Sequence, residues 1–390
     1  GIAIFDALSE QYEFVDLAQR VDFVKDLDWN DNGLYPRCIY NITLENSDNI
    51  DSALRALEAD PNIIFAEFEP VYELEHIPND ASYDMQWGHQ FMQSEQAWDY
   101  TTGSENIVIG IVDSGIKWNH PDLQENIWVN EPELNSTSGG NPMTINWTSG
   151  SVSGGNGIDD DGNGKIDDCI GWNFYGSQSN QSYQDFGDND HGTHVAGCAG
   201  AVGDNYIGVT GPMMTVKLIS SRHSPDNFYS NSIYGGDLGI YYCADSGADV
   251  INCSFGGPGG SYTYNNAVNY AQGVGSVVVA AAGNDNINVG TNPHYPGNAT
   301  NAICVAATGP NSDVKANFSS FGPPVDVSAP GSGIYSTIIN GNGYASFNGT
   351  SMASPIVAGV TGLIKSIHPT ISAADLKTRV ELTCDDIDAL

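Results

Sequence analysis

The segment Ile107-Val-Ile-Gly-Ile-Val-Asp113 is almost entirely β-branched and ends on a carboxylate. A strand that is apolar on both faces is typical of a parallel sheet with helices on both sides. Further segments share this character and are followed by turns rich in glycine or serine, namely Thr215–Ser220, Val250–Phe255, Ser276–Ala281 and Ala302–Ala306. Together they predict an α/β domain with a mainly parallel central sheet.

Helical patterns alternate with these strands at His191–Ala201, Ser232–Ser246, Thr263–Gln272, Ser351–Ile367 and Ser372–Leu382. Functional groups of open parallel sheets gather beyond the carboxyl ends of the strands. Asp113, Ser254 and Asn284 each lie at such an end. We therefore expect these side chains at one edge of the sheet.

The first part of the chain has a different character. It contains an alternating run, Cys38–Leu44, a helical stretch, Asn49–Asp60, and Pro61–Tyr72, which we expect to end as a strand. A polar segment, His76–Ser82, is typical of a linker. The sequence therefore predicts a small α+β domain over residues 1–78 and a larger domain over residues 79–390.

The 390 residues include 48 acidic and 12 basic side chains, a formal net charge of −36. Such a surface repels phosphate backbones and anionic lipids, so we expect neither a nucleic-acid nor a membrane partner. Solubility in a salty or calcium-containing medium is the ordinary account of the acidity, and a role in selecting substrates is the alternative.

The seven cysteines show no close pairing pattern and no CxxC metal pair, which leaves one or two disulfides open. The chain starts without a signal peptide, and we expect this start to be a trimmed end.

Serine hydrolysis needs a nucleophilic hydroxyl, an imidazole that takes its proton and a carboxylate that orients the imidazole. Ser351 lies in Asn348-Gly-Thr-Ser-Met-Ala-Ser-Pro355, where glycine precedes it and an apolar helical run follows. This pattern predicts a helix N-terminus, whose backbone N–H groups favour a developing oxyanion. We expect Pro355 among the first helical residues, where its missing N–H breaks no bond. The alternative for Ser351 is an ordinary N-cap.

His191 opens another helix start, His191-Gly-Thr-His-Val-Ala-Gly197. A metal pair of His191 and His194 is the alternative, but no third ligand motif lies near, and we expect His194 to be packed in the core. Asp113 follows a buried strand and needs a partner there, since an unpaired buried carboxylate is costly; capping the turn is the alternative. Asn284 is placed either to cap a turn or to donate to an oxyanion.

Taken together, these segments resemble the subtilisin-like protease family. The order Asp, His, Ser is that of subtilisin, and the resemblance runs from about Asp80 to Ile387. The matching motifs are Ile111-Val-Asp-Ser-Gly115, His191-Gly-Thr-His-Val-Ala-Gly197, Ile251-Asn-Cys-Ser-Phe-Gly-Gly257, Ala280-Ala-Ala-Gly-Asn284 and Gly349-Thr-Ser-Met-Ala-Ser-Pro355.

The resemblance implies a three-layer fold and a secreted serine endopeptidase that works through an acyl-enzyme intermediate. It makes Ser351 the nucleophile, His191 the general base and acid, and Asp113 the residue that orients His191. Asn284 and the Ser351 backbone N–H would donate to the oxyanion. We expect these side chains in the order Asp to His to Ser, joined by hydrogen bonds.

The resemblance also implies how protein or peptide substrates bind. Ser254, Phe255 and Gly256 resemble the edge that pairs with an extended substrate, and Gly283 belongs to the same binding set. The segment His294-Tyr-Pro-Gly297 resembles the turn beside the main specificity pocket, where we expect a cis Tyr295–Pro296 bond.

Two other functions stay open from the sequence. One is a catalytically silent binding or adhesion module, against which the intact Asp113, His191, Asn284 and Ser351 argue. The other is an esterase with the same triad, and the absence of a Gly-x-Ser-x-Gly elbow around Ser351 counts against it.

An acidic run, Asp159-Asp-Asp-Gly-Asn-Gly-Lys-Ile-Asp-Asp168, lies in an insert over residues 130–190. A short loop that binds Ca²⁺ has oxygen ligands at its first, third and fifth positions and glycine at its sixth, as this run does. The twelfth position is Ile170 rather than the glutamate of an EF-hand, so we expect a shortened loop closed by Asp168. The predicted set is Asp159, Asp161, Asn163, Lys165 and Asp168, and the alternative is a solvated acidic turn.

A second, structural Ca²⁺ site follows from the resemblance. Its predicted set is Asp122, Gly203, Asn205, Ile207 and Val209, with Asp80 as a further candidate. No organic cofactor is expected.

The N-terminal block resembles the inhibitory prodomains of these proteases, chiefly over Ala59–Pro70. An unrelated α+β module is the alternative. The resemblance implies self-cleavage within Tyr72–Ser82 and inhibition by the freed fragment, Gly1 to about Glu75. It also implies a further strand and helix beyond Leu390, so we expect the catalytic domain to continue there.

Overall fold

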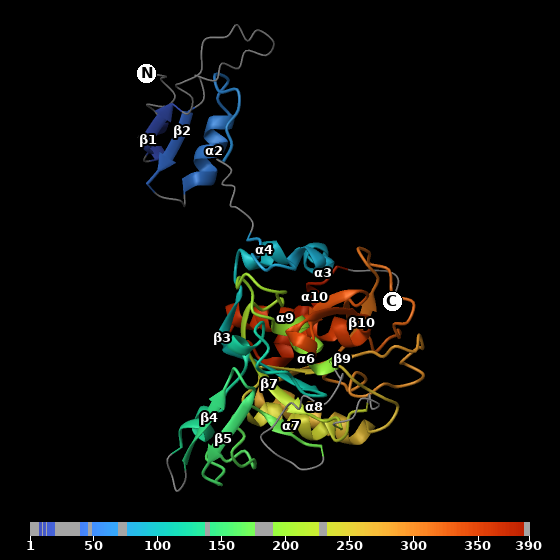
Figure 1. Ribbon diagram of the computed structural model, residues 1–390. Helices are drawn as coiled ribbons and strands as arrows, with labels where there is room; N and C mark the ends of the chain where they lie inside the picture. Colours follow the sequence, from blue (N-terminus) through green and yellow to red (C-terminus); the bar gives the residue numbers. More distant parts are fainter. Residues whose placement is uncertain are drawn as a thin grey trace. The chain divides into compact units, whose positions relative to one another are not determined.

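The computed structural model describes residues 8–9, 11–12, 14–19, 40–45, 49–68, 76–136, 141–175, 190–225 and 232–385. The chain divides into two compact units, Gly1–Leu74 and Glu75–Leu390 (Figure 1). The division lies before His76, whereas the sequence placed it after Pro78. The reason is that His76 makes its described contacts with residues of the larger unit, including Asp99 and Asp204.

The small unit pairs β1 (Phe14–Gln19) with β2 (Tyr40–Leu44) in antiparallel fashion and adds the helix α2 (Ile50–Glu58). Leu57 of α2 is buried with Leu8 in a small apolar core. The strand expected at the end of Pro61–Tyr72 is not found over residues 61–68, which form turns and irregular chain. Residues 69–72 lie outside the described part.

The large unit is built on a sheet of seven strands, and every neighbouring pair is parallel. In spatial order these are β11 (Val327–Pro330), β10 (Ile303–Thr308), β9 (Val277–Ala281), β8 (Val250–Cys253), β3 (Gly103–Asp113), β7 (Thr215–Arg222) and β6 (Trp172–Asn173). The strand predicted from Ile107–Val112 is therefore the central β3, and its apolar faces are buried on both sides as expected.

Helices cover both faces of this sheet, as the alternating pattern predicted. On one face α6 (His191–Gly200) and α9 (Thr350–Ile367) pack against each other and against β3, and α10 (Ala373–Leu382) packs beside α9. On the other face lie α7 (Gly236–Asp245) and α8 (Ser261–Val274), which appear together below the sheet in Figure 1. The result is the three-layer α/β arrangement.

One glycine of β3 shows how closely these layers approach. A Cβ added to Gly110 would lie 2.6 Å from both Cβ and Sγ of Cys243 in α7. A side chain at that position would push the helix off the sheet, so the β-branched run is interrupted there by glycine. Like Cys243, the other cysteines in the described part are free, at Cys169, Cys198, Cys253, Cys304 and Cys384.

Shorter elements complete the large unit. They are the helices α3 (Trp87–Phe91), α4 (Ser94–Trp98) and α5 (Glu131–Asn135) and the antiparallel pairs β4 (Asn141–Asn146) with β5 (Ser151–Gly155) and β12 (Ile334–Thr337) with β13 (Tyr344–Phe347). The β4–β5 hairpin lies within the insert over residues 130–190. Within the described residues, no helix is long and apolar enough to cross a membrane.

Candidate active site

Asp113 is the last residue of β3, and its side chain is only 1% exposed. Its Oδ1 accepts a hydrogen bond from the Ser114 backbone N–H at 2.6 Å and lies 2.8 Å from Nδ1 of His191. Its Oδ2 has no hydrogen-bond partner among the described residues. Because a buried carboxylate is stable only when it is paired, this arrangement ties Asp113 to the imidazole rather than to the turn alone.

His191 is the first residue of α6, and its side chain is 35% exposed. Nδ1–H donates to Asp113, which leaves Nε2 as the basic nitrogen of the neutral ring. Burial lowers the pKa of His191, but the charge of Asp113 and its hydrogen bond outweigh burial and raise that pKa above its ordinary value. The imidazole therefore accepts a proton more readily than a free histidine does.

Ser351 is the second residue of α9. Pro355 lies four residues further along, so its missing N–H is the one that would have bonded to the Ser351 carbonyl. Our expectation that this proline breaks no bond is therefore wrong. The freed carbonyl accepts a hydrogen bond from the Ser254 hydroxyl at 2.8 Å instead.

Ser254 and Ser351 are joined in both directions. The Ser351 hydroxyl donates to the Ser254 carbonyl at 3.0 Å, while the Ser254 hydroxyl donates to the Ser351 carbonyl. Asn252 of β8 supports this contact, because its Nδ2 donates to the Ser254 hydroxyl at 2.9 Å. The end of β8 thus fixes the start of α9, a contact that sequence reasoning missed because no local pattern indicates it.

Only the first of the two expected hydrogen bonds, Asp113 to His191, is found among the described residues. The Ser351 hydroxyl donates to Ser254 rather than to His191. A serine hydroxyl rotates to the nearest acceptor, and hydrogen bonds of this kind are often absent before substrate binds. The three side chains still come from β3 and from the first turns of α6 and α9, which pack together.

Asn284 follows β9 and is held by the start of α9. Its Oδ1 accepts hydrogen bonds from the backbone N–H and the hydroxyl of Thr350, at 2.8 and 3.0 Å. With the carbonyl oxygen occupied, the Nδ2 group remains as a donor, and no bond from it is found in the described part. A Cβ built on Gly349 would lie 3.5 Å from this Nδ2, so the amide lies beside the turn before Ser351.

The segment after β8 forms an edge beside Ser351. Gly257 exchanges two backbone hydrogen bonds with Tyr295, at 2.8 and 3.0 Å. The Tyr295–Pro296 bond is cis, as predicted. Phe255 packs in a tilted arrangement against Tyr264 of α8, with ring centroids 6.2 Å apart.

His194 is fully buried, as predicted for a core histidine. Its Nε2 lies 3.0 Å from the carbonyl oxygens of both Ile334 and Ala345, and its ring stacks on Phe347. Burial lowers the pKa of His194 to about 4, so the ring is neutral near pH 7. These contacts belong to the packing of α6 against β12 and β13 and exclude a metal pair with His191.

The acidic loop, defined here as residues 159–168, is held largely by its own backbone. Asp159 accepts from the N–H groups of Gly162 and Gly164, and Asp161 accepts from that of Asn163. Asp161 and Asp168 also share the side-chain amides of Asn130 and Asn163. The predicted oxygen ligands therefore lie together.

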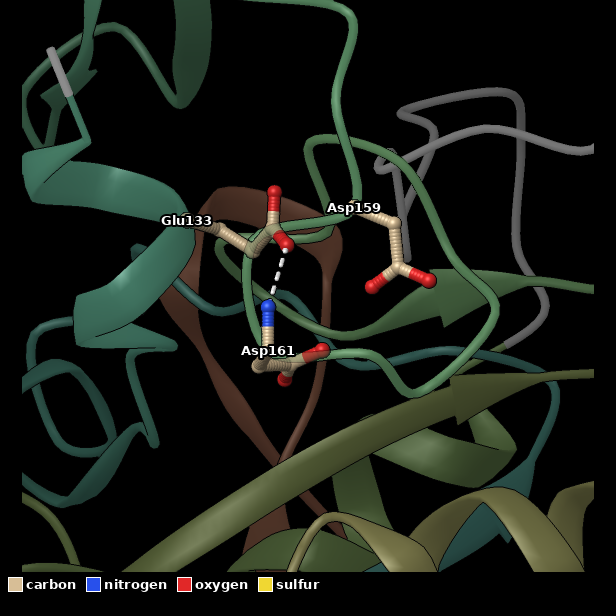
Figure 2. Close-up of side chains that lie close together, drawn as sticks. All are labelled: Glu133, Asp159 and Asp161. Atoms are coloured by element: carbon tan, nitrogen blue, oxygen red, sulfur yellow. Dashed lines mark hydrogen bonds between the residues drawn. The ribbon is translucent and has the colours of Figure 1, made fainter. Parts of the chain in front are cut away.

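Glu133 of α5 reaches into the acidic loop and was missed by sequence reasoning. One oxygen of each of Glu133, Asp159 and Asp161 lies within 4.8 Å of the others (Figure 2). Glu133 also accepts from the backbone N–H groups of Asp160 and Asp167, at 2.6 and 2.9 Å. Such a set of carboxylate oxygens fits a hard divalent cation. No spacing rule connects a residue of α5 with this loop.

Two other members of the predicted set are placed differently. Asp168 is buried, and burial raises its pKa to about 7 despite the hydrogen bonds from Tyr242 and Asn163. The ammonium of Lys165 lies over the rings of Trp172 and Phe174, so only its backbone carbonyl is available as a ligand. A cavity of about 690 Å³ opens beside Asp161 and Asn163, and its lining does not include Asp113, His191 or Ser351.

The second predicted metal site gathers around Asp122, which is fully buried. Its Oδ1 accepts from Nδ2 of Asn205 at 2.7 Å and its Oδ2 from the Val209 N–H at 2.8 Å. Burial raises the pKa of Asp122 to about 7, although these hydrogen bonds lower it. Asp80, from the segment before α3, accepts from the Asp204 N–H at 2.9 Å, and its buried Oδ1 has no partner among the described residues.

Comparisons with known proteins agree with this geometry. Residues 104–388 match the family model described as the subtilase family. The chain is 40% identical to thermitase from Thermoactinomyces vulgaris over 313 residues, which covers 80% of this chain and 93% of thermitase. It is 34% identical to an extracellular protease from Xanthomonas campestris, covering 85% of this chain and 57% of that protein.

A solved structure shares the fold. The proteases from Pseudoalteromonas arctica superpose with a TM-score of 0.59 at 30% identity, covering 80% of this chain and 93% of theirs. The chain thus has a parallel sheet between two helical layers and a paired aspartate and histidine at the edge of that sheet. Its sequence is also similar to known proteases over most of its length. The chain belongs to the subtilase family, and it is a serine endopeptidase.

Proposed function

We propose that the chain hydrolyses peptide bonds with Ser351 as nucleophile, His191 as general base and Asp113 as the residue that orients His191. The observation that carries this proposal is the 2.8 Å contact between Asp113 and His191, where α6 packs against the helix α9 that begins at Thr350 and Ser351. The raised pKa of His191 supports its role as the proton acceptor.

In the proposed reaction, the Ser351 hydroxyl turns from the Ser254 carbonyl toward His191. Nε2 of His191 takes the hydroxyl proton as Oγ bonds to the substrate carbonyl carbon. The oxyanion receives hydrogen bonds from the Ser351 N–H and from Nδ2 of Asn284. Transfer of the proton to the departing amine leaves an acyl-enzyme, which water then hydrolyses with His191 again as base.

Fluorophosphonate labelling tests this assignment against a catalytically silent module. The wild type should be labelled, whereas Ser351→Ala should not, and Ser366→Ala in the same helix is the matched control. Ser366 lies near the C-terminal end of α9 and donates to the Leu363 carbonyl, so its loss should leave labelling at Ser351 in place. Absence of labelling in a folded wild type would favour the silent module.

We propose that an extended peptide pairs with the edge formed by Ser254, Phe255 and Gly256, opposite Gly283. Backbone hydrogen bonds at such an edge hold any extended peptide, and pockets select its side chains. The double contact between Ser254 and Ser351 supports this proposal, because it sets the edge at a fixed distance from the nucleophile.

We propose that the acidic loop holds a structural Ca²⁺ ion. Asp159, Asp161 and Glu133 would be ligands, with Asn163, Asp168 and the Lys165 carbonyl completing the set. The mutual approach of three carboxylates supports this, since bringing them together without a cation is unfavourable. The ion would neutralise the loop and fix its conformation.

We propose a second structural Ca²⁺ around Asp122. Asn205 and the backbone carbonyls of Gly203, Ile207 and Val209 would contribute, together with Asp80. The unpartnered buried oxygen of Asp80 supports the proposal, because a buried carboxylate oxygen without a donor is stabilised by a cation. This ion would tie the start of the catalytic unit to the loop after α6.

We propose that the small unit is a prodomain, which the enzyme removes within Tyr72–Ser82 and which then inhibits it. The His76 backbone N–H donates to Asp99, and its imidazole lies 2.8 Å from Asp204. These contacts with the large unit support a cut on the N-terminal side of His76. N-terminal sequencing of the mature wild type tests it, and Ser351→Ala should remain uncut.

A mature terminus outside Tyr72–Ser82, or full activity of uncut wild type, would contradict the prodomain assignment. We also propose that the protein acts outside the cell, as the name of the Xanthomonas relative suggests. Activity confined to the cells rather than the medium would contradict secretion.

A further inference from the structure

The imidazole of His294 lies between two glycines, Gly256 and Gly283. A Cβ built on Gly256 would lie 2.4 Å from both Cδ2 and Nε2 of this ring. A Cβ built on Gly283 would lie 3.1 Å from its Cε1 and Nδ1. The ring therefore presents one edge to each glycine and occupies the space that their missing side chains leave.

This space lies beside the nucleophile. Gly256 follows Ser254, which is joined to Ser351 in both directions. Gly283 donates its backbone N–H to the Thr350 hydroxyl at 3.1 Å and directly precedes Asn284. A peptide whose carbonyl lies between Ser351 and Asn284 therefore places the side chain of its acyl residue near this space.

The backbone on both sides of the ring is fixed. The His294 N–H donates to Oδ1 of Asn298 at 2.8 Å, and its carbonyl accepts from the Asn298 N–H at 2.9 Å. Tyr295 is held by its two hydrogen bonds with Gly257. Partial burial lowers the pKa of His294, against the charge of Asp285, which favours the neutral ring. The ring can therefore leave the space only by rotation of its own side chain.

We infer that His294 fills most of the pocket for the residue before the scissile bond and restricts cleavage to small residues there, such as glycine, alanine and serine. This inference rests on the proposed function of Ser351 and Asn284. A phenylalanine or leucine would have to displace the imidazole from contacts with both glycines. An alanine needs no more room than its methyl group.

The test uses the mature enzyme and peptides that differ only in the residue before the scissile bond, as alanine, phenylalanine or glutamate. The wild type should have a kcat/KM for alanine at least about 100-fold above that for phenylalanine, within the range known for size selection in pockets. His294→Gly should shift this ratio at least about tenfold toward phenylalanine. His294→Phe, which keeps a ring in the pocket, should retain the preference for alanine.

Equal wild-type cleavage after alanine and phenylalanine, or an unchanged ratio in His294→Gly, would overturn the inference. A preference for glutamate that His294→Phe abolishes would also overturn it, because the imidazole would then recognise charge instead of filling space. Fluorophosphonate labelling of each variant reports whether Ser351 is intact. A wild type that neither labels nor cleaves any peptide refutes the proposed function, whereas a labelled enzyme with the wrong preference refutes only the role of His294.

Discussion

The carboxylate at the sheet edge and those of the acidic loop are held by different kinds of neighbour. Asp113 is buried and paired with His191, and regular elements of the sheet and the two central helices position both. Asp159 and Asp161 are held mainly by backbone N–H groups of their own loop, and a third carboxylate, Glu133, faces them. In the first region a protein side chain pairs with the carboxylate, whereas the second region collects negative charge that a cation would balance. Changes at the first should therefore affect catalysis, and changes at the second should affect stability.

The largest expected effect is at the sheet edge. Ser351→Ala should lower kcat by at least about 10⁴-fold, since loss of the nucleophile leaves only binding and oxyanion stabilisation; the corresponding loss measured in subtilisin is about 2 × 10⁶. The melting temperature should hardly change, because one hydroxyl contributes little packing. Steady-state kinetics and thermal unfolding of the same preparation measure both. Peptidase activity near the wild-type level would mean that another residue is the nucleophile.

Removing Asn284, the proposed oxyanion donor, should have a smaller effect in the same region. Asn284→Ala should lower kcat by about 10²–10³-fold with little change in KM, because the amide meets charge only in the transition state. Asn269→Ala, an exposed amide on α8, is the control and should retain wild-type kinetics. A wild-type kcat for Asn284→Ala would refute its role.

The acidic loop should respond to calcium instead. An ion that binds only the folded state at 100 times its Kd stabilises by about 2.7 kcal/mol, so EDTA should lower the melting temperature by several degrees and Ca²⁺ should restore it. Asp161→Ala should remove much of this response, whereas Asp313→Ala, an exposed carboxylate elsewhere, should not. Calorimetry in EDTA and in millimolar Ca²⁺ measures it. A melting temperature that changes neither in EDTA nor in millimolar Ca²⁺ would rule out both calcium proposals.

The smallest expected effect is a shift in the pH profile. The Asp113–His191 pair raises the pKa of His191, and catalysis needs the neutral ring, so kcat/KM should rise with pH through a midpoint above 6.5. The free energy of unfolding should change with pH in the opposite direction to the activity. The Asp113–His191 pair stabilises the fold fully at pH values below the pKa of an unfolded histidine, and this contribution is lost as the pH rises through the pKa of His191 in the folded protein. A midpoint below 6.5 would show that burial outweighs Asp113.

The sequence by itself determined the elements and most of the site. The apolar runs gave β3, β7, β8, β9 and β10, and the small-residue helix starts placed His191 and Ser351 at α6 and α9. These features were predictable because β-branched runs and glycine turns act within a few residues of themselves. The same local logic placed Asn284 after β9 and the proposed oxygen ligands of Ca²⁺ within one short acidic loop.

The tertiary structure decided what depends on contacts between distant segments. Glu133 joins Asp159 and Asp161 only because α5 packs against their loop. The role of Pro355 could not be seen without Ser254, whose hydroxyl bonds to the carbonyl that the proline leaves free. The position of His294 between Gly256 and Gly283 likewise arises where three loops meet. Burial and hydrogen bonding are properties of the packed chain, so the sequence supplied the reactive groups and the fold set their partners and the space around them.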